Sequence, residues 1–374
     1  MKKRVKDDEP RQWQQTVADS TWRAAVRRRL MVWFRGAHRP LPWRESRDPY
    51  RVWISEIMLQ QTQVATVEGY FRRFMDRFPD VAALAAADEQ DVLKLWEGLG
   101  YYRRAQQLHR ASRQIVAEHG DGFPRKFDDV LALPGIGRYT AGAICSIAFD
   151  DRRPILEANS RRVLARWVAM PGDVTRPSVE AQLWSVAEKL LPRKNVGVYN
   201  QAVMELGSLV CKPAAPRCDD CPVAPLCQTR RLGKTSEIPA AKAKTPITPV
   251  TELALVIRRD GDVLLRFRGP DERWSGMWDF PRAPLEAEAP APREIHCQRL
   301  GAKVELGRPI GIIQYGVTRY RVTMRCYEGV IKNGRQCGQP AKNADPTRWV
   351  RLEELDRIAL NVSGRKLARL IQRV

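Results

Sequence analysis

Four closely spaced cysteines form the clearest chemical pattern in the sequence. They follow the spacing C-x6-C-x2-C-x5-C as Cys211, Cys218, Cys221 and Cys227. Because thiolates are soft ligands, four of them within seventeen residues predict one shared metal centre; the pattern favours an iron–sulfur cluster and leaves structural zinc open as the alternative. The other four cysteines, Cys337 among them, are scattered, which is not typical of a disulfide framework and indicates a reducing compartment.

An acid in apolar surroundings is the second candidate. Glu56 lies within Val52-Trp53-Ile54-Ser55-Glu56-Ile57-Met58-Leu59, whose apolar members would desolvate the carboxyl group and raise its pKa toward neutrality. A carboxylic acid that keeps its proton near neutral pH can protonate a leaving group. The alternative is a helical glutamate that simply reaches solvent.

Polar side chains follow this acid directly, as Gln60, Gln61, Thr62 and Gln63. Such side chains suit contacts with base edges and the gap that an extruded nucleotide leaves in a duplex. They would equally form an ordinary exposed helix face.

A glycine-containing turn, Leu133-Pro134-Gly135-Ile136-Gly137-Arg138, separates two helical stretches. Gly135 and Gly137 would let backbone amides approach a phosphate at the start of the next helix, as in the helix-hairpin-helix DNA-binding motif that this segment resembles. An ordinary helix-capping turn is the alternative.

The charge balance favours a nucleic acid as the partner. Lys and Arg number 64 against 43 Asp and Glu, a formal net charge of +21, and so large a surplus indicates a polyanion, with the DNA duplex as the first candidate. On charge alone, RNA, anionic lipid and a merely solubilising surface stay open. No apolar run approaches the ~18 residues that span a bilayer. Acidic residues follow Lys2-Lys3-Arg4, which argues against a secretory signal.

The positions of apolar residues predict the elements that must hold these groups. Residues 1–20 are expected to be a disordered tail, and residues 21–230 an all-α region, because apolar side chains recur there at three- and four-residue steps. Asp48 followed by Pro49 predicts a helix start, with the helix running through Glu56. Further helices are predicted at 89–96, 105–119, 139–149, 160–168, 179–190 and 200–210.

A second domain is predicted after a linker. Residues 231–248 are rich in proline, lysine and small side chains, the composition of a linker. Residues 249–374 are predicted to be a smaller α+β domain. Its predicted strands include 253–257 and 263–267, on either side of a hairpin turn, Arg259-Asp260-Gly261-Asp262, and 320–331.

Several motifs together resemble the MutY adenine DNA glycosylase family. In family order they are Leu41-Pro42-Trp43-Arg44, the stretch from Trp53 to Val64, Gly98-Leu99-Gly100-Tyr101-Tyr102, the glycine turn, Tyr199-Asn200-Gln201-Ala202 and the cysteine spacing. The resemblance covers nearly the whole chain. It implies a helix-hairpin-helix glycosylase domain with a 4Fe-4S cluster loop, followed by a Nudix-like domain at 249–374. Within the helical region it implies a helix-hairpin-helix subdomain at about 50–145, and a cluster subdomain made of 21–49 and 146–230.

The resemblance also implies roles for individual residues. Glu56 would donate a proton to adenine and help water attack. Gln61 and Tyr101 would support the opened duplex. Trp43 and Arg44 would line the base pocket.

Tyr139 bears on the type of reaction. Related bifunctional glycosylases carry a lysine nucleophile at the corresponding place, and a tyrosine cannot form the Schiff base that such a lysine forms. The sequence therefore predicts base removal by water without strand cleavage. Without the motif around it, Tyr139 is interpreted as a half-buried aromatic residue.

The first departure from the family pattern is Glu157. The segment Glu157-Ala158-Asn159 aligns with a family segment reading Asp-Gly-Asn, so the carboxylate expected to stabilise the cationic sugar is one methylene longer. Because such stabilisation depends on placement, we expect slower turnover or a shifted helix start. Asn159 would orient this carboxylate or the water. Glu157 could also be a plain acid at a helix start.

The second departure lies in the Nudix-like domain, which family members use to sense 8-oxoguanine. Trp274 to Pro281 supports this match, but Val317-Thr318-Arg319 aligns with the family's Phe-Ser-His recognition loop. Arg319 could hydrogen-bond the oxidised base or contact phosphate. Because Arg293-Glu294 lacks the Glu-Glu pair of the Nudix metal site, pyrophosphatase activity is not expected.

The sequence therefore predicts a monomeric, monofunctional glycosylase that flips adenine out of an A:8-oxoguanine or A:G mispair and hydrolyses its bond to the sugar. A thymine or uracil mismatch glycosylase and a non-catalytic lesion-binding protein are the alternatives. The expected compartment is the cytoplasm, at the nucleoid, of a bacterium, or the nucleus or mitochondrion of a eukaryote.

Overall fold

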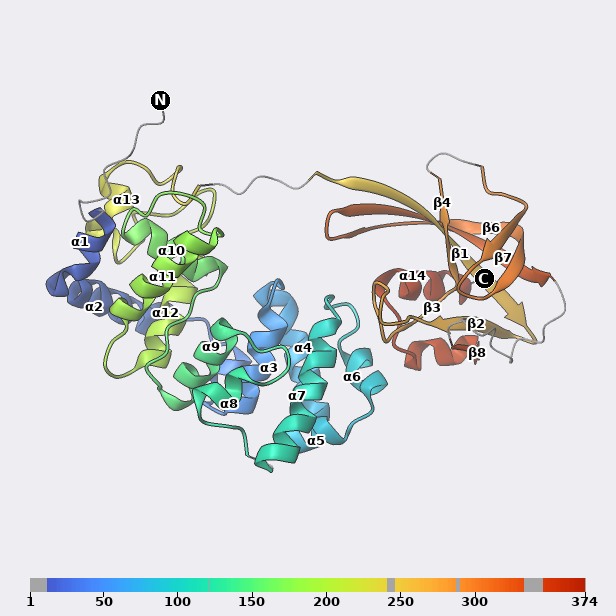
Figure 1. Cartoon of the computed structure of the whole chain (residues 1–374), viewed down its shortest axis with the longest axis horizontal. Coiled ribbons are helices and arrows are strands. Elements are labelled where there is room, and N and C mark those ends of the chain that lie inside the picture. The colour runs from blue at the N-terminus through green and yellow to red at the C-terminus, as the bar shows by residue number, and fades with distance from the viewer. Residues whose placement is uncertain (1–11, 121, 241–245, 287–289, 333–345, 374) are drawn as a thin grey trace. The chain divides into compact units, whose positions relative to one another are not determined.

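The computed structural model of the chain describes residues 12–120, 122–240, 246–286, 290–332 and 346–373. Contacts divide the chain into two compact units, residues 1–81 with 114–243 and residues 82–113 with 244–374. The first unit is helical and the second holds the sheet (Figure 1). Within the described ranges, no helix is both long and apolar enough to cross a membrane.

Helices build the first unit, which confirms the predicted all-α character of this region. In chain order the elements are α1 (Gln12–Ala18), α2 (Ser20–Ala37), η1 (Pro42–Arg44), α3 (Pro49–Leu59), α4 (Val64–Arg77), α8 (Phe127–Leu131), α9 (Arg138–Phe149), α10 (Ala158–Trp167), α11 (Pro177–Leu190), α12 (Val196–Leu209), η2 (Ala224–Leu226) and α13 (Gln228–Arg231). The contact division assigns α5 (Val81–Ala86) almost wholly, and α6 (Glu89–Leu95) wholly, to the second unit, and it cuts α7 (Arg103–His119). Each helix predicted from the sequence is present, with its ends moved by a few residues. The subdomain bounds stay predictions.

The prediction of a disordered tail is wrong for residues 12–20. Trp13 and Val17 lie one turn apart in α1, and both are buried in the same apolar cluster as Trp22 of α2. Burial of this apolar pair stabilises a short helix that propensity alone would not. Asp19 then caps α2, because its Oδ1 accepts a hydrogen bond from the amide of Thr21 at 2.8 Å. Residues 1–11 lie outside the described part of the chain.

The predicted linker is also partly packed. Ile238 is 7% exposed and belongs to the apolar core of the first unit. Its carbonyl oxygen accepts a hydrogen bond from Nε of Arg166 at 2.8 Å. One apolar residue in a Pro- and Lys-rich stretch therefore holds this segment against the helices. Residues 241–245 of the linker lie outside the described ranges.

The start of α3 is as predicted. Oδ1 of Asp48 accepts a hydrogen bond from the amide of Tyr50 at 3.0 Å, and Pro49 occupies the first helical turn, where no amide partner is needed. The helix is buried on most of its surface and packs against α4 and α9. This packing brings Glu56, on the last turn of the helix, into the interior of the unit.

A close approach between α10 and α12 depends on a glycine. A Cβ atom built on Gly207 of α12 would lie 2.6 Å from Cβ of Asn159 and 3.2 Å from its backbone. Since real Cβ contacts are not this short, only glycine lets the start of α10 lie against α12 at this distance. The two helices also contact each other along their length.

A mixed sheet forms the centre of the second unit. Its strands within the described residues are β1 (Thr248–Arg259), β2 (Asp262–Phe267), β3 (Trp278–Asp279), β4 (Arg282–Leu285), β5 (Glu294–Cys297), β6 (Ala302–Val317), β7 (Tyr320–Lys332) and β8 (Thr347–Arg351). They are ordered β3-β2-β1-β7-β6-β5, with β4 paired to β1 and β8 to β2. β1 and β7 are parallel and their neighbours antiparallel. The predicted α+β class is confirmed.

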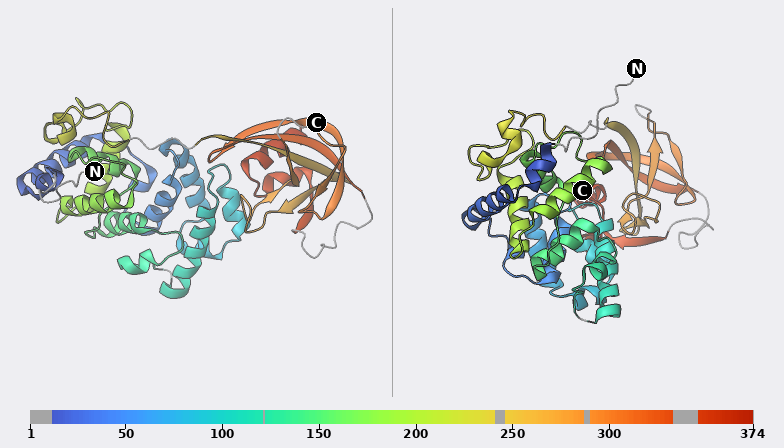
Figure 2. Two further views of the ribbon diagram at one scale, coloured as in Figure 1. Left: turned by 45° about the horizontal axis from the view of Figure 1, so that its top comes forward. Right: turned by 60° about the vertical axis from the view of Figure 1, so that its left-hand side comes forward.

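One face of this sheet is covered by α14 (Val362–Ile371), which follows η3 (Leu352–Arg357) (Figure 2). Met324 and Ile313 of the sheet and Leu367 of the helix share one apolar core. The predicted hairpin turn between β1 and β2 is confirmed, since Asp260 and Gly261 both have positive φ, of 50° and 86°.

The β6–β7 hairpin carries the segment aligned with the family's recognition loop. Val317 pairs with Tyr320, so Thr318 and Arg319 form a two-residue loop. Thr318 has a φ of 49°, a left-handed conformation that is uncommon for a β-branched residue. The hairpin therefore ends in a tight turn that exposes both loop side chains.

Candidate active site

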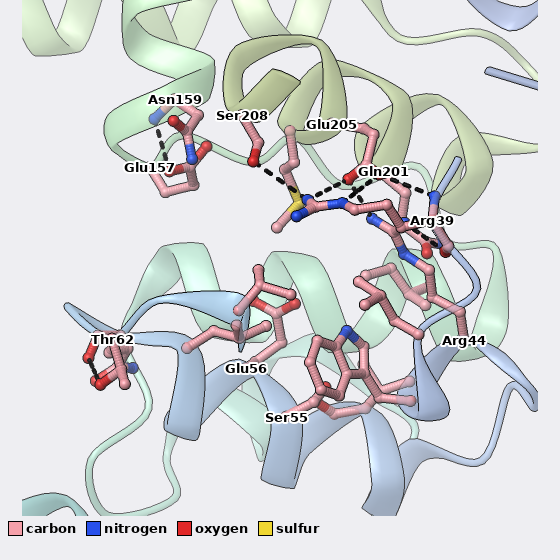
Figure 3. Close-up of a pocket in the computed structure, with 18 of the residues that line it drawn as sticks. Arg39, Arg44, Ser55, Glu56, Thr62, Glu157, Asn159, Gln201, Glu205 and Ser208 are labelled. Carbon is pink, nitrogen blue, oxygen red and sulfur yellow. Dashed lines mark hydrogen bonds and ion pairs between the residues drawn. The ribbon is translucent and has the colours of Figure 1, made fainter. Parts of the chain in front are cut away.

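A cavity of about 440 Å³ opens among η1, α3, α9, α10 and α12 of the first unit. This volume lies in the range of pockets that hold small molecules. Nine of the residues predicted from the sequence line it: Trp43, Arg44, Glu56, Gln60, Gln61, Thr62, Tyr139, Glu157 and Asn159. Glu56 points from α3 into the cavity, across from the side chains of α10 and α12 (Figure 3). The two candidate carboxylates thus share one pocket.

Glu56 is a buried acid, only 4% exposed. Burial raises its pKa to about 7, and the neighbouring charge of Glu157 acts in the same direction. A hydrogen bond from Tyr139 and the charge of Arg44 partly oppose the rise. Glu56 therefore does not reach solvent, and it can hold or release a proton near neutral pH.

Tyr139 lies at the second position of α9 and is half-buried. Its hydroxyl donates a hydrogen bond to Oε2 of Glu56, with 2.5 Å between the oxygens. Burial, together with the two nearby carboxylates, raises the pKa of the phenol well above its ordinary value. The phenol thus keeps its proton and acts as a hydrogen-bond donor.

Glu157 is the N-cap of α10. Its Oε2 accepts from the amide of Asn159 at 2.6 Å and its Oε1 from the amide of Ser160 at 2.7 Å. In return, the Glu157 amide donates to Oγ of Ser160 at 2.7 Å, which completes a capping box. Burial raises the pKa of Glu157, and the two amides oppose that rise. The longer side chain is therefore accommodated by capping, a role usually filled by shorter residues.

Asn159 connects the cavity to the cysteine loop through Arg162. Nη2 of Arg162 donates to Oδ1 of Asn159 at 2.8 Å, and its Nε donates to the carbonyl oxygen of Cys211 at 2.7 Å. The same Nη2 also reaches the carbonyl oxygen of Gly207 at 2.9 Å. This arginine fixes the orientation of the Asn159 amide.

The sequence reasoning missed Glu205, a cavity residue that is 1% exposed. Its Oε2 lies 2.8 Å from Nη2 of Arg39 and 3.0 Å from Nη2 of Arg44. Burial alone would raise the pKa of Glu205, but the hydrogen bonds from both arginines lower it to about 2. This anion holds Arg44 at the cavity wall (Figure 3). A lone acid in an apolar helix segment, Val203-Met204-Glu205-Leu206, is the signal that could have found it.

Of the four polar residues after α3, some line the cavity and others lie at the surface or at the start of α4. Gln60 donates to Oγ1 of Thr140 at 3.3 Å, beside the cavity. Gln61 is exposed and has a positive φ of 58°, a conformation uncommon for glutamine. Thr62 lines the cavity, whereas Gln63 occupies the N-cap position of α4 without a side-chain capping bond and is not among the cavity residues.

Tyr101 lies in the second unit and is 48% exposed, with a positive φ of 49°. The guanidinium carbon of Arg104 lies 5.4 Å from the ring centre of Trp96 and 5.5 Å from that of Tyr101. Nη2 of Arg104 also donates to the carbonyl oxygen of Gly100 at 3.2 Å. These contacts hold an exposed aromatic ring on a turn of unusual backbone conformation.

The glycine turn has the expected form. Gly135 has a φ of 78°, which requires glycine here, and Gly137 caps α9 with its backbone alone. Both glycines are exposed. The amides at the start of α9 therefore lie at the surface, where an anion can approach them.

The four clustered cysteines line one small cavity together with Arg166 and Arg230. Nη1 of Arg166 lies 3.4 Å from Sγ of Cys211, and Sγ of Cys227 lies 3.3 Å from the carbonyl oxygen of Arg166. Within the described residues, no three His, Cys, Asp or Glu side chains converge closely enough to hold a single metal ion. A cluster with four irons needs only one thiolate at each iron, so this donor set fits it. Cys337 lies outside the described ranges.

Comparisons with known proteins agree with this arrangement. Residues 54–189 match the model of the HhH-GPD superfamily base excision DNA repair proteins, and residues 253–370 match the NUDIX domain. The two matched regions correspond to the helical part and the sheet part of the chain. The predicted fold class, a helix-hairpin-helix domain followed by a Nudix-like domain, is confirmed.

Several relatives with known names are adenine DNA glycosylases. The one from Buchnera aphidicola subsp. Schizaphis graminum is 37% identical over 253 residues, which cover 67% of this chain and 73% of that protein. The one from Homo sapiens is 39% identical over 72% of this chain and 50% of that protein, so the chain spans about half of the human relative.

Among solved structures, a thermostable thymine-DNA glycosylase is 27% identical, with a TM-score of 0.52 over 57% of this chain and 100% of that one. Its fold corresponds to the helical part of this chain. Identity to the Buchnera protein over nearly three quarters of its length decides the family. The chain belongs to the adenine DNA glycosylase family.

Proposed function

We propose that this protein is a monofunctional glycosylase that removes adenine from a mispair with 8-oxoguanine or guanine in duplex DNA. The observation that carries the proposal is the position of Glu56, buried in a base-sized cavity with a pKa of about 7, hydrogen-bonded to Tyr139 and sharing the cavity with Glu157. A buried acid of this pKa suits both proton donation and proton acceptance.

The reaction needs adenine outside the base stack and inside the cavity. Protonated Glu56 gives its proton to a ring nitrogen of the base. The bond between the base and C1′ of the sugar then breaks, and its electron pair leaves with the neutral adenine. The oxocarbenium-like sugar that remains is stabilised by the anionic carboxylate of Glu157, which the α10 amides hold in place.

Water completes the reaction. The carboxylate of Glu56 accepts a proton from a water molecule while the hydroxide oxygen bonds to C1′, which restores the acid and leaves an abasic site. Tyr139 keeps its proton and cannot form a Schiff base, so no strand cleavage accompanies base removal. Asn159, held by Arg162, orients the water or Glu157.

Contact with the DNA around the opposite base is assigned to the second unit. The tight loop of the β6–β7 hairpin presents Val317, Thr318 and Arg319 at the aligned position of the family's recognition loop. Gln61 and Tyr101, both exposed and both at positive φ, are assigned to the gap in the opened duplex. The glycine turn at Gly135 and Gly137 would bind a phosphate through its amides.

A 4Fe-4S cluster is proposed at Cys211, Cys218, Cys221 and Cys227. When bound, it supplies a rigid crosslink that holds the cysteine loop in one conformation. Arg217 and Arg230, partly exposed beside the loop, would then contact phosphates. We expect a monomer that acts where DNA is stored, in the bacterial nucleoid or in a eukaryotic nucleus or mitochondrion.

A second candidate function follows from the structural likeness to a thymine-DNA glycosylase. Thymine removal from a T:G mispair would use the same cavity. Glu56 argues for adenine, since a purine offers ring nitrogens that this acid can protonate.

Single-turnover assays on duplexes that differ only in the mispair test the proposal. We expect adenine release opposite 8-oxoguanine and guanine, no thymine or uracil release, and strand breaks only after alkali. Glu56→Gln should slow release by about 10²- to 10⁴-fold. Release of thymine alone would assign the second function. Lesion binding without any base release would make the protein a non-catalytic binder.

A further inference from the structure

Arginine and aromatic side chains gather at the tip of the β6–β7 hairpin. The guanidinium carbon of Arg273 lies 5.0 Å from the ring centre of Tyr320, and that of Arg319 lies 5.2 Å from the same centre. The two charges are thus at most about 10 Å apart. We call Arg273, Arg319 and Tyr320 the hairpin-tip cluster. Arg321 lies next to it and packs across Gly316 of the facing strand.

The loop that carries Arg273 is held against the sheet. Trp274 has a positive φ of 62°, and its ring centre lies 5.7 Å from that of Tyr315 on β6. The guanidinium carbons of Arg268 and Arg282 lie 5.3 and 5.4 Å from the Trp274 ring. Arg273 is therefore next to a packed residue, Trp274, and its position does not depend on the contact with Tyr320 alone.

Within the part of the domain that the structure describes, no acid neutralises the charges of the hairpin-tip cluster. Other arginines of this domain pair with acids, as Arg268 does with Asp279 at 2.5 Å and Arg308 with Glu328 at 2.7 Å. Among the described residues, no carboxylate lies within ion-pair distance of Arg273, Arg319 or Arg321. These arginines are exposed, and aromatic rings hold them in place. Because no acid pairs with them, their guanidinium groups can donate several hydrogen bonds to an anion outside the protein.

We propose that the hairpin-tip cluster binds the phosphate backbone of duplex DNA and does not read the opposite base. Duplex DNA carries one negative charge per ~1.7 Å of its axis, so two guanidinium groups this close together face several phosphates. Arg319 also donates from Nη2 to the hydroxyl of Tyr320 at 3.3 Å, which holds its guanidinium back against the hairpin. The proposal rests on DNA being the substrate.

Salt dependence of binding separates phosphate contacts from base contacts. Full-length protein would be titrated against an undamaged, fully paired duplex, with fluorescence anisotropy read at several KCl concentrations. Arg273→Gln combined with Arg319→Gln should lower the slope of log Kd against log salt by about 2, because two phosphate contacts are lost. The affinity for an A:8-oxoguanine duplex should fall by the same factor as that for the undamaged duplex.

Exposed arginines of the same domain provide a matched control. Arg308 pairs with Glu328, and Arg351 lies 3.6 Å from Glu353. Arg308→Gln combined with Arg351→Gln removes the same charge but should leave the slope near that of the unchanged protein. Tyr320→Leu keeps both charges of the cluster and should give an intermediate slope. Circular dichroism and the melting temperature would verify that each variant folds.

Three results would overturn the proposal: an unchanged slope in the cluster variant, an equal loss in the control variant, and a loss confined to the 8-oxoguanine duplex. The third would assign base reading to Arg319. Adenine release is measured separately. If the cluster variant lowers the slope but the unchanged protein releases no adenine, the phosphate contact is supported and the proposed glycosylase function is rejected.

Discussion

The hydroxyl of Tyr139 and Oε2 of Glu56 lie 2.5 Å apart, in a cavity that also contains the carboxylate of Glu157. This hydrogen bond favours the charged form of Glu56, while burial and Glu157 favour the neutral form. The balance leaves the pKa of Glu56 at about 7. The acid is therefore divided between its two forms near neutral pH, and its reactivity there depends on pH.

The pH dependence of base release follows from this pKa. Proton donation needs neutral Glu56, so the single-turnover rate should be highest below pH 7 and fall above it, approaching tenfold per pH unit. Rates measured from pH 5.5 to 9 on one A:8-oxoguanine duplex check this. A rate that stays constant to pH 9 would remove Glu56 as the proton donor.

Tyr139→Phe should move the falling limb of that profile to higher pH. The variant loses the hydrogen bond that lowers the pKa of Glu56, so the acid keeps its proton longer as pH rises. Tyr199→Phe is the matched control, because the buried Tyr199 hydroxyl has no hydrogen-bond partner among the described residues. Equal shifts in both variants would mean that the Tyr139 contact does not set the pKa.

Glu157→Gln should slow base release by about 10²- to 10³-fold, because it removes the negative charge that faces the cationic sugar. Glu157→Asp should stay within about tenfold of the unchanged protein, because aspartate also caps helices well and keeps the charge. Melting temperatures would show whether α10 remains capped in both variants. Similar rates for the glutamine and aspartate variants would reduce Glu157 to a structural cap.

Glu205→Gln should destabilise the protein by about 3 kcal/mol at pH 7, since a pKa lowered from 4.5 to about 2 corresponds to roughly that free energy. A lowered pKa stabilises the fold above pH ~4.5, and this contribution is lost as pH falls toward 2. The difference in urea unfolding between variant and parent should therefore shrink below pH 4.5. Glu180→Gln, which removes a partly exposed ion pair with Arg161, should cost less than ~1 kcal/mol and serves as the control.

Arg104→Lys should weaken lesion binding by about three- to tenfold, because a lysine cannot stack between Trp96 and Tyr101 as a guanidinium does. The effect should disappear when Tyr101→Ala is already present, which a double-mutant cycle detects. Arg103→Lys, an exposed neighbour, should leave binding unchanged. Additive losses in the cycle would show that Arg104 acts independently of Tyr101.

The fold followed from the sequence wherever local signals and burial agree. Asp48-Pro49 marked the start of α3, and Asp260-Gly261 marked a hairpin, because each pattern suits only a few backbone conformations. Trp13 and Ile238 contradict the predicted tail and linker because single apolar residues found partners far along the chain. Such partners are set by tertiary packing, which composition does not encode.

The candidate site was predictable only in part, for a similar reason. Apolar neighbours marked Glu56 as buried, and the structure places it beside Tyr139 and Glu157 in one cavity. Glu205 carries the same kind of signal, but its effect depends on Arg39, which lies 166 positions earlier in the chain. The use of Glu157 as a cap depends on the backbone at the start of α10, which its residue type did not indicate.

Gly207, which has no side chain, restricts which substitutions the pocket can accept. With Asn159 2.6 Å from where a methyl group would lie, even alanine would have to push the N-terminal end of α10 outward and carry Glu157 with it. Spacing between the two carboxylates is thereby set by a residue that touches neither. Substitutions elsewhere in the pocket can change its chemistry without moving Glu157 only as long as position 207 remains glycine.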